Sequence, residues 1–151
     1  METGSVSAIF VTRVHGELPE PVDRVRALAG KGLEGNRYFY ANGAAPGGRA
    51  LTLIASEALA DFERETSTGL AAAETRRNVL TRGIDVNALV GKRFRIGAVE
   101  CRGVELCEPC THLQSMTRPE VLKGLVHRGG LNADILSDGE IAVGDTITVE
   151  E

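Results

Sequence analysis

Short stretches in which apolar and polar residues alternate recur along the chain. Alternation with a period of two is typical of a strand with one buried face. Pairs such as Gly-Ala, Asp-Gly and Gly-Asp separate several of these stretches and can form tight turns. The pattern predicts strands at residues 6–10, 25–29, 50–55, 78–81, 94–96, 99–106, 131–135, 141–143 and 147–149.

Two segments have instead the period of about 3.6 residues that marks an amphipathic helix. Ser56 can cap a helix that runs through Thr66, and the capping-box pair Thr117 and Glu120 precedes a second helix. Asp85 can cap a shorter helical turn. Because the predicted strands are short and outnumber the helices, the pattern predicts a barrel or sandwich decorated by two helices.

Composition and charge narrow the class of protein. The length of 151 residues predicts a single domain over residues 1–151, and 42% apolar with 25% charged residues is ordinary for a globular protein. Eighteen glycines exceed the usual share of about 7% and favour a turn-rich β fold. The net charge of −4 argues against nucleic-acid and membrane partners. The sequence shows neither a membrane-spanning apolar run nor a secretory leader, so we expect a cytoplasmic protein.

The most informative stretch is residues 105–112, Glu-Leu-Cys-Glu-Pro-Cys-Thr-His. A thiolate is a soft metal ligand and a good nucleophile when nearby positive charge or donors lower its pKa. Pro109 fixes the backbone before Cys110 and would aim that thiol reproducibly. Cys101 lies at an apolar position of a predicted strand, so we expect it in the core. For Cys107, a core position and a site position are both open.

The spacing of Cys107 and Cys110 is also compatible with two other kinds of site. A thioredoxin-like dithiol normally lies at a strand-to-helix junction of a βαβ unit, and no such unit is predicted here. A structural zinc ion needs about four ligands, and the chain offers three cysteines and three scattered histidines. Both sites are alternatives to a single reactive thiolate at Cys110.

Three further motifs offer polar groups. Residues 76–78, Arg-Arg-Asn, include arginine forks that suit phosphate or carboxylate. Neighbours on a strand point to opposite faces, so we expect at most one of the two arginines to face a given site. Residues 32–37, Gly-Leu-Glu-Gly-Asn-Arg, form neither a P-loop nor a dinucleotide fingerprint. His127 could cap helix carbonyls or donate a proton.

In this order, the motifs resemble the MOSC family, which comprises the C-terminal domains of molybdenum cofactor sulfurases and their stand-alone relatives. The resemblance spans roughly residues 5–149, and its strongest part is the run 77–83 followed by the cysteine pair. It implies a mainly β fold, a closed or partly open β-barrel decorated by two or three short helices. The matching stretches are residues 32–37, 49–57, 76–91, 106–110, 127–130 and 144–145.

The resemblance implies that the chain binds molybdenum cofactor (molybdopterin), with Cys110 as the thiolate ligand of the metal. It implies a reductase of N-oxygenated small molecules, whose electrons come from a separate donor protein because the chain carries no ferredoxin-like cysteine cluster. One alternative is a sulfur carrier that receives sulfur from a donor protein and holds a persulfide on Cys110. Another is a non-catalytic binding protein. The residues expected near the cofactor are Arg37, Arg49, Arg77, Asn78 and His127, with Arg77 as a phosphate partner.

The chain departs from the family pattern at two positions. Asn36 stands where relatives commonly have Asp, and Ala50 replaces an amide side chain that often follows the arginine. Each change removes a charge or a hydrogen-bonding group that a ligand could otherwise meet.

Overall fold

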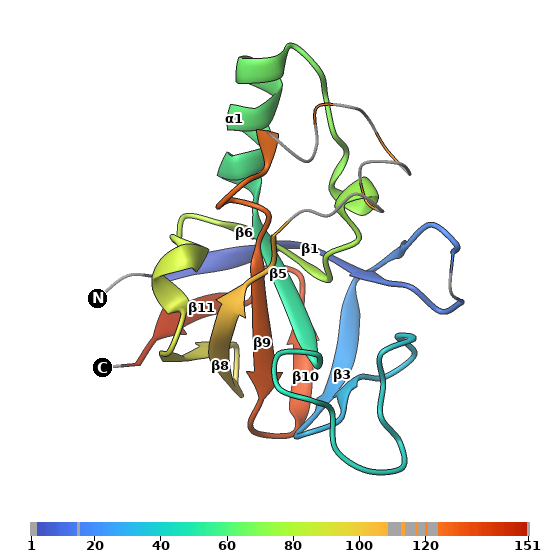
Figure 1. Ribbon diagram of the computed structural model, residues 1–151. Coiled ribbons are helices and arrows are strands. Elements are labelled where there is room, and N and C mark those ends of the chain that lie inside the picture. The colour runs from blue at the N-terminus through green and yellow to red at the C-terminus, as the bar shows by residue number, and fades with distance from the viewer. Residues whose placement is uncertain are drawn as a thin grey trace.

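Strands dominate the computed structural model, which describes residues 3–14, 16–108, 113, 117, 120 and 124–150 (Figure 1). The strands are β1 (Thr3–Val11), β2 (Glu20–Val22), β3 (Arg24–Leu28), β4 (Gly32–Leu33), β5 (Leu51–Ala55), β6 (Val79–Arg82), β7 (Arg93–Ile96), β8 (Val99–Leu106), β9 (Leu131–Ile135), β10 (Gly139–Ala142) and β11 (Thr146–Val149). The described helical elements are α1 (Ser56–Thr66) and the 3-10 turns η1 (Ala72–Thr75) and η2 (Val86–Leu89).

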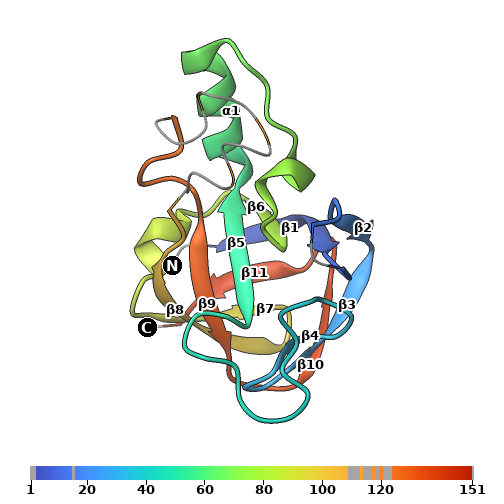
Figure 2. The same ribbon diagram turned by 45° about the vertical axis from the view of Figure 1, so that its right-hand side comes forward.

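Seven of the strands form a closed, mixed β-barrel. Their order is β11-β7-β8-β9-β5-β6-β1, and β1 pairs back with β11 to close the sheet. Strands β5 and β6 are parallel because the crossover between them contains α1 and η1, whereas the other pairs around the barrel are antiparallel. Strand β2 adds to the end of β1, and β10, β3 and β4 form a small second sheet (Figure 2). This architecture confirms the predicted mainly β barrel with a few short helices.

Alternate residues of the barrel strands fill its interior. Phe94, Ile96, Val99 and Cys101, from the hairpin of β7 and β8, are all 0% exposed, as the alternation predicts. Val143 is an exception, since it is 45% exposed. It follows the last residue of β10, where the chain turns toward β11, so the strand period no longer applies to it.

Helix α1 projects from one end of the barrel (Figures 1 and 2). It packs over a small second core. That core contains Phe62 of the helix together with Leu70, Leu113 and Leu125. The span of the helix is as predicted, but the prediction that Ser56 caps it is wrong. The N-cap is Ala55, the last residue of β5, because the strand continues directly into the helix.

Two other helical segments were predicted, a short turn capped by Asp85 and a helix after Thr117. Asp85 does cap the short turn η2, since its carboxylate accepts a hydrogen bond of 3.0 Å from the amide of Asn87. The helix predicted after Thr117 lies largely outside the described residues. Its described part includes an amide-to-carbonyl bond of 2.8 Å from Gly124 to Glu120. No described helix is long and apolar enough to cross a membrane.

Gly103 marks the closest approach of η2 to the barrel wall and gives a test of the packing. A Cβ atom at this position would overlap the carbonyl oxygen of Leu89. We therefore expect Gly103→Ala to lower the free energy of unfolding by about 1–3 kcal/mol, measured by urea denaturation. Gly47→Ala is the control, because a Cβ atom there would meet nothing within 4 Å. Equal midpoints for the two variants would contradict this packing.

Candidate functional site

A cavity of about 500 Å³ lies against the outer face of the barrel, where β5 and β9 pair. Thr52 and Asn132 are directly opposed in these two strands, and both line the cavity while their neighbours face the core. The volume is within the range of about 300–1,000 Å³ that is typical of small-molecule sites. The walls come from Thr12 and Gly16 and from residues of the segments 36–38, 48–49, 76–78 and 105–108.

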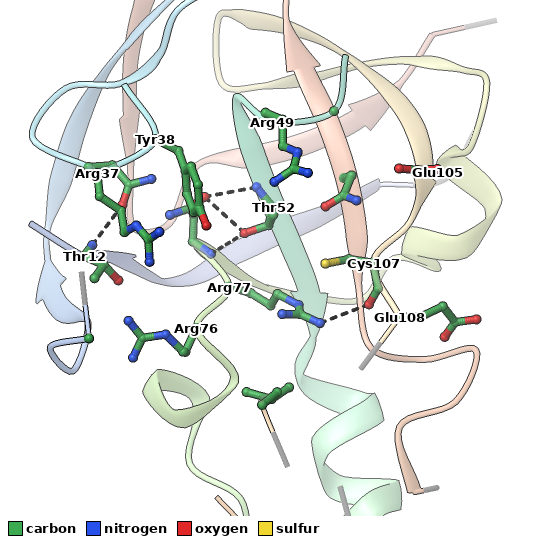
Figure 3. Close-up of a pocket in the computed structure, with 16 residues that line it drawn as sticks. Thr12, Arg37, Tyr38, Arg49, Thr52, Arg76, Arg77, Glu105, Cys107 and Glu108 are labelled. Carbon is green, nitrogen blue, oxygen red and sulfur yellow. Dashed lines mark hydrogen bonds between the residues drawn. The ribbon is translucent and has the colours of Figure 1, made fainter. Parts of the chain in front are cut away.

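Four of the residues predicted from the sequence line this cavity together. They are Arg37, Arg49, Arg77 and Asn78, which come from separate parts of the chain (Figure 3). His127 is not among the lining residues. Cys110 lies outside the described residues, as do His15 and His112.

Arg76 also lines the cavity, so the expectation that only one of the two adjacent arginines faces the site is wrong. That expectation assumed a strand, but β6 begins only at Val79. Arg76 caps η1 and has a left-handed backbone with φ of 63°. Both guanidinium groups can therefore reach the same side, which the alternation of a strand would prevent.

The Arg77 guanidinium binds three backbone carbonyl groups of the protein. Its Nε donates to the carbonyl of Gly129 (2.7 Å), its Nη1 to that of Thr75 (3.2 Å) and its Nη2 to that of Cys107 (3.0 Å). Three of its five N–H groups are thus engaged. Arg77 joins the end of η1 to the chain after β8 and to the chain before β9, and its two other N–H groups have no acceptor among the described residues.

The side chain of Asn78 likewise forms hydrogen bonds within the protein, between strands next to the cavity. Its Oδ1 accepts hydrogen bonds from the amide and the hydroxyl of Thr52, both at 3.1 Å. Its Nδ2 donates to the carbonyl of Phe10 at 3.1 Å. The side chain is largely buried and joins β1 to β5 beside β6, so it fixes the spacing of three strands at the cavity.

Of the four arginines that line the cavity, three have guanidinium groups with no hydrogen-bond acceptor among the described residues: Arg37, Arg49 and Arg76. Arg37 stacks on the ring of Tyr38, with 4.4 Å from its Cζ to the ring centroid. Burial, and then the charge of Arg37, lower the pKa of Arg76, although a guanidinium stays protonated at neutral pH. The described lining includes four arginines against Glu105 and Glu108, so the cavity is basic.

The described cysteines have different surroundings. Cys101 is fully buried in the barrel, and burial raises the pKa of its thiol to about 12, which agrees with the predicted core position. Cys107 is half-buried and lines the cavity, so of the two readings of this residue the structure supports the site position. Its sulfur points toward the cavity in Figure 3. No group of three described His, Cys, Asp or Glu side chains could hold a metal ion.

His127 and Glu108 connect the two segments that lie beside the cysteine motif. Glu108 accepts a hydrogen bond from the His127 amide (2.7 Å), and its second oxygen lies 2.8 Å from Nδ1 of the ring. The His127 carbonyl accepts a bond of 2.6 Å from Asn87. The Cys107 amide donates to the Gly130 carbonyl at 2.7 Å. The segment 127–130 therefore holds the chain just before Cys110 through backbone and side-chain bonds.

The family model described as MOSC domain matches residues 12–148. The chain belongs to the MOSC domain family. This family is associated with binding of the molybdenum cofactor.

Solved structures with the same fold as this MOSC domain include three bacterial proteins. YuaD from Bacillus subtilis is 14% identical, with a TM-score of 0.84 over 97% of this chain and 95% of that chain. YiiM from Geobacillus stearothermophilus is 16% identical, with a TM-score of 0.75 over 98% and 75% of the two chains. YiiM from Escherichia coli is 19% identical, with a TM-score of 0.69 over 100% and 70%. No curated protein sequence matches the chain.

Two features of the MOSC site were not predicted from the sequence. Arg76 was missed because nothing predicted the turn η1, which gives it its left-handed backbone. Glu108 was missed as the partner of His127 because 19 residues separate the two. Asn36 is one of the departures from the family pattern. Its Oδ1 accepts a hydrogen bond of 2.9 Å from the Thr12 amide, as a carboxylate could also do.

The three carbonyl contacts of Arg77 predict that lysine cannot replace it. A lysine ammonium lacks the planar fork needed to span three carbonyls at once. We expect Arg77→Lys to lower the free energy of unfolding by about 1–3 kcal/mol in urea denaturation. Arg76→Lys is the matched control and should leave stability nearly unchanged, because no described acceptor binds that guanidinium. Equal losses in the two variants would show that Arg77 has no such structural role.

The pKa of Cys101 predicts its reactivity. A thiol with a pKa of about 12 stays protonated throughout the neutral range, and its thiolate appears only as the pH approaches that value. We expect iodoacetamide to leave Cys101 unmodified in the native protein from about pH 7 to 9, and to modify it in urea, as measured by peptide mass spectrometry. Modification of native Cys101 at neutral pH, at the rate seen in urea, would refute the buried position.

Proposed function

We propose that this MOSC domain binds the molybdenum cofactor in the basic cavity and reduces N-oxygenated small molecules there. The observation that carries this proposal is the set of three guanidinium groups, Arg37, Arg49 and Arg76, that face the cavity without a described acceptor. Desolvated like charges are unfavourable unless an anion neutralises them. An arginine fork matches the oxygens of a phosphate, which the pterin cofactor carries.

The residues present fit the cofactor in charge, size and donor chemistry. The cavity has room for a small organic group, and its lining mixes guanidinium forks with the neutral polar side chains of Thr52 and Asn132. Arg49, with the two remaining N–H groups of Arg77, would hold the phosphate, and Arg37 would contribute further positive charge. Asn78 would keep the strands beneath the ligand in place. Cys110, three residues beyond the cavity-lining Cys107, would supply the thiolate to the metal.

The proposed reaction requires a source of electrons and protons. Reduction of an N-hydroxyl group to an amine consumes two electrons and two protons and releases water. The bound cofactor supplies the two-electron redox centre, and the protein supplies binding, orientation and charge. The electrons would come from a separate donor protein, as the family resemblance implies for a reductase. The substrate would be a small molecule, in keeping with a cavity of about 500 Å³.

The cavity favours this function over a sulfur carrier. A carrier needs a thiol with a lowered pKa, but it has no need for a permanent site for an anion. A basic cavity next to the cysteine motif is the feature that a cofactor site requires. A persulfide on Cys110 is the outcome to look for if the cofactor proposal fails.

Molybdenum content tests the proposal directly. The protein is purified from a host with an intact molybdenum cofactor pathway, and metal is measured by elemental mass spectrometry. We expect near-stoichiometric molybdenum in wild type and in Cys107→Ser, and its loss in Cys110→Ser, because only the last change removes the proposed ligand. Cys101→Ser is a second control, in a residue buried away from the cavity.

The possible results separate the alternatives. Loss of molybdenum in Cys107→Ser, with retention in Cys110→Ser, would move the ligand to Cys107. Absence of molybdenum from wild type would reject the cofactor proposal. Mass spectrometry after incubation with cysteine and a cysteine desulfurase would then look for a sulfur adduct on Cys110.

A further inference from the structure

A long loop, residues 34–50, joins β4 to β5 and contains no helix or strand (Figures 1 and 2). It carries Arg37 near its start and Arg49 near its end, and both side chains line the cavity (Figure 3). Because like charges repel, two guanidinium groups on one unsupported loop would move apart. The spacing of these two cations therefore depends on what holds the loop.

At its two ends, the loop is bonded to residues in or beside the barrel strands. Near the start, the Arg37 amide donates to the Thr12 carbonyl at 2.7 Å. Near the end, the Gly48 amide donates to the Asp134 carboxylate, also at 2.7 Å. These bonds place the backbone beside each arginine, and they leave residues 38–47 to be held by other contacts.

The middle of the loop is bound by the ammonium group of Lys31, which lies in the turn between β3 and β4. Its Nζ donates to the carbonyls of Tyr40 (3.4 Å), Ala41 (3.0 Å) and Gly43 (3.1 Å). An ammonium group has three N–H donors, so three carbonyls of one turn match its full donor set. The lysine therefore gathers the backbone of this turn around a single positive charge.

Residues 40–45 have few other hydrogen bonds to the rest of the protein. Among the described residues, the remaining ones come from two amides, that of Tyr40 to the Lys31 carbonyl (3.0 Å) and that of Ala45 to the Gly30 carbonyl (2.6 Å). Hydrogen bonds to a charged group are stronger than those between neutral groups. The bonds to the ammonium are thus the main hydrogen-bonded link that holds this turn.

We propose that Lys31 is a positioning residue for the cavity. By holding the turn 40–43, its ammonium group keeps Arg37 and Arg49 at the spacing at which both meet the same anionic ligand. Lys31 is not among the residues that line the cavity, so it acts through the loop and does not touch the ligand. The inference rests on the proposed function for the identity of the anion, whereas the hold on the loop can be measured without it.

The first experiment measures amide hydrogen exchange by NMR on protein without cofactor, produced in a host that lacks the molybdenum pathway. Lys31→Met keeps the length of the side chain and removes its charge and donors. We expect the amides of Tyr40 and Ala45 to exchange at least about tenfold faster, because charge-assisted hydrogen bonds are lost, and those of β7 and β8 to be unchanged. Lys92→Met is the matched control, since Lys92 is exposed and its side chain forms no hydrogen bond with a described residue.

The second experiment measures binding of inorganic phosphate to the same protein by calorimetry. We expect Lys31→Met to weaken binding by about tenfold, and Lys92→Met, with the same loss of charge, by no more than about twofold. Binding is measured at about 0.15 M salt, where the Debye length is about 8 Å and long-range effects of charge are largely screened. A loss that persists under these conditions separates lost positioning from lost charge.

Chemical rescue covers a methionine variant that fails to fold. Lys31→Ala leaves space for the missing part of the side chain, which propylammonium can fill. We expect propylammonium chloride to restore slow exchange at Tyr40 and Ala45 together with phosphate binding, and sodium chloride at the same concentration to restore neither. Lys31→Arg keeps the charge, but its planar fork differs from the compact ammonium, so we expect it to retain only part of the binding. Equal effects of the two salts would contradict a role for the ammonium group.

The outcomes are distinct from those of the proposed function. Equal exchange in wild type and Lys31→Met, or faster exchange with unchanged phosphate binding, would overturn the positioning role. Wild type that binds phosphate but acquires no molybdenum in a host with the pathway would reject the cofactor and leave the role of Lys31 intact. Wild type that binds no phosphate would reject the cavity as an anion site, and the positioning role with it.

Discussion

Pairing of β1 with β11 closes the barrel, and the position of the site follows from that closure. A closed sheet has no free edge among its seven strands, so their inner faces share one apolar core and their outer faces have fixed neighbours. Thr52 and Asn132 face outward because the residues on either side of each face the core. They form the base of a cavity whose walls come from segments next to several different strands, at Thr12 and at residues 36–38, 48–49, 76–78 and 105–108. The basic groups on those segments come from two stretches of the chain, 37–49 and 76–77, and do not all depend on one loop.

Within the cavity, polar groups divide into those that build the walls and those that remain for a ligand. Asn78 uses its amide to join three strands, and Arg77 uses three N–H groups to join three segments. The guanidinium groups of Arg37, Arg49 and Arg76 face the cavity and have no hydrogen-bond acceptor among the described residues. This division explains how a cluster of four arginines can persist in a folded chain. The bonds of Arg77 to three carbonyls offset the cost of removing its guanidinium from water.

The sequence predicted most of the fold because alternation reports directly on burial, as the hairpin of β7 and β8 shows. It predicted poorly where one element continues into another, as at Ala55, where the strand leaves no room for a serine cap. For the site, family resemblance selected Arg37, Arg49, Arg77 and Asn78, and the structure brings them to one cavity. Arg76 was misjudged because strand geometry was applied to a residue that ends a 3-10 turn. The contact between Glu108 and His127 depends on long-range packing that no local pattern records.

The left-handed backbone at Arg76 has a consequence for how this protein could change over generations. A side chain with positive φ costs roughly 1 kcal/mol relative to glycine, which adopts that conformation freely. Replacement by glycine would relax the backbone and at the same time delete a cation from the cavity. Selection for stability alone would therefore erase this charge, whereas selection for an anionic ligand would retain it. At position 76, stability of the backbone favours glycine, whereas binding of an anion would favour arginine.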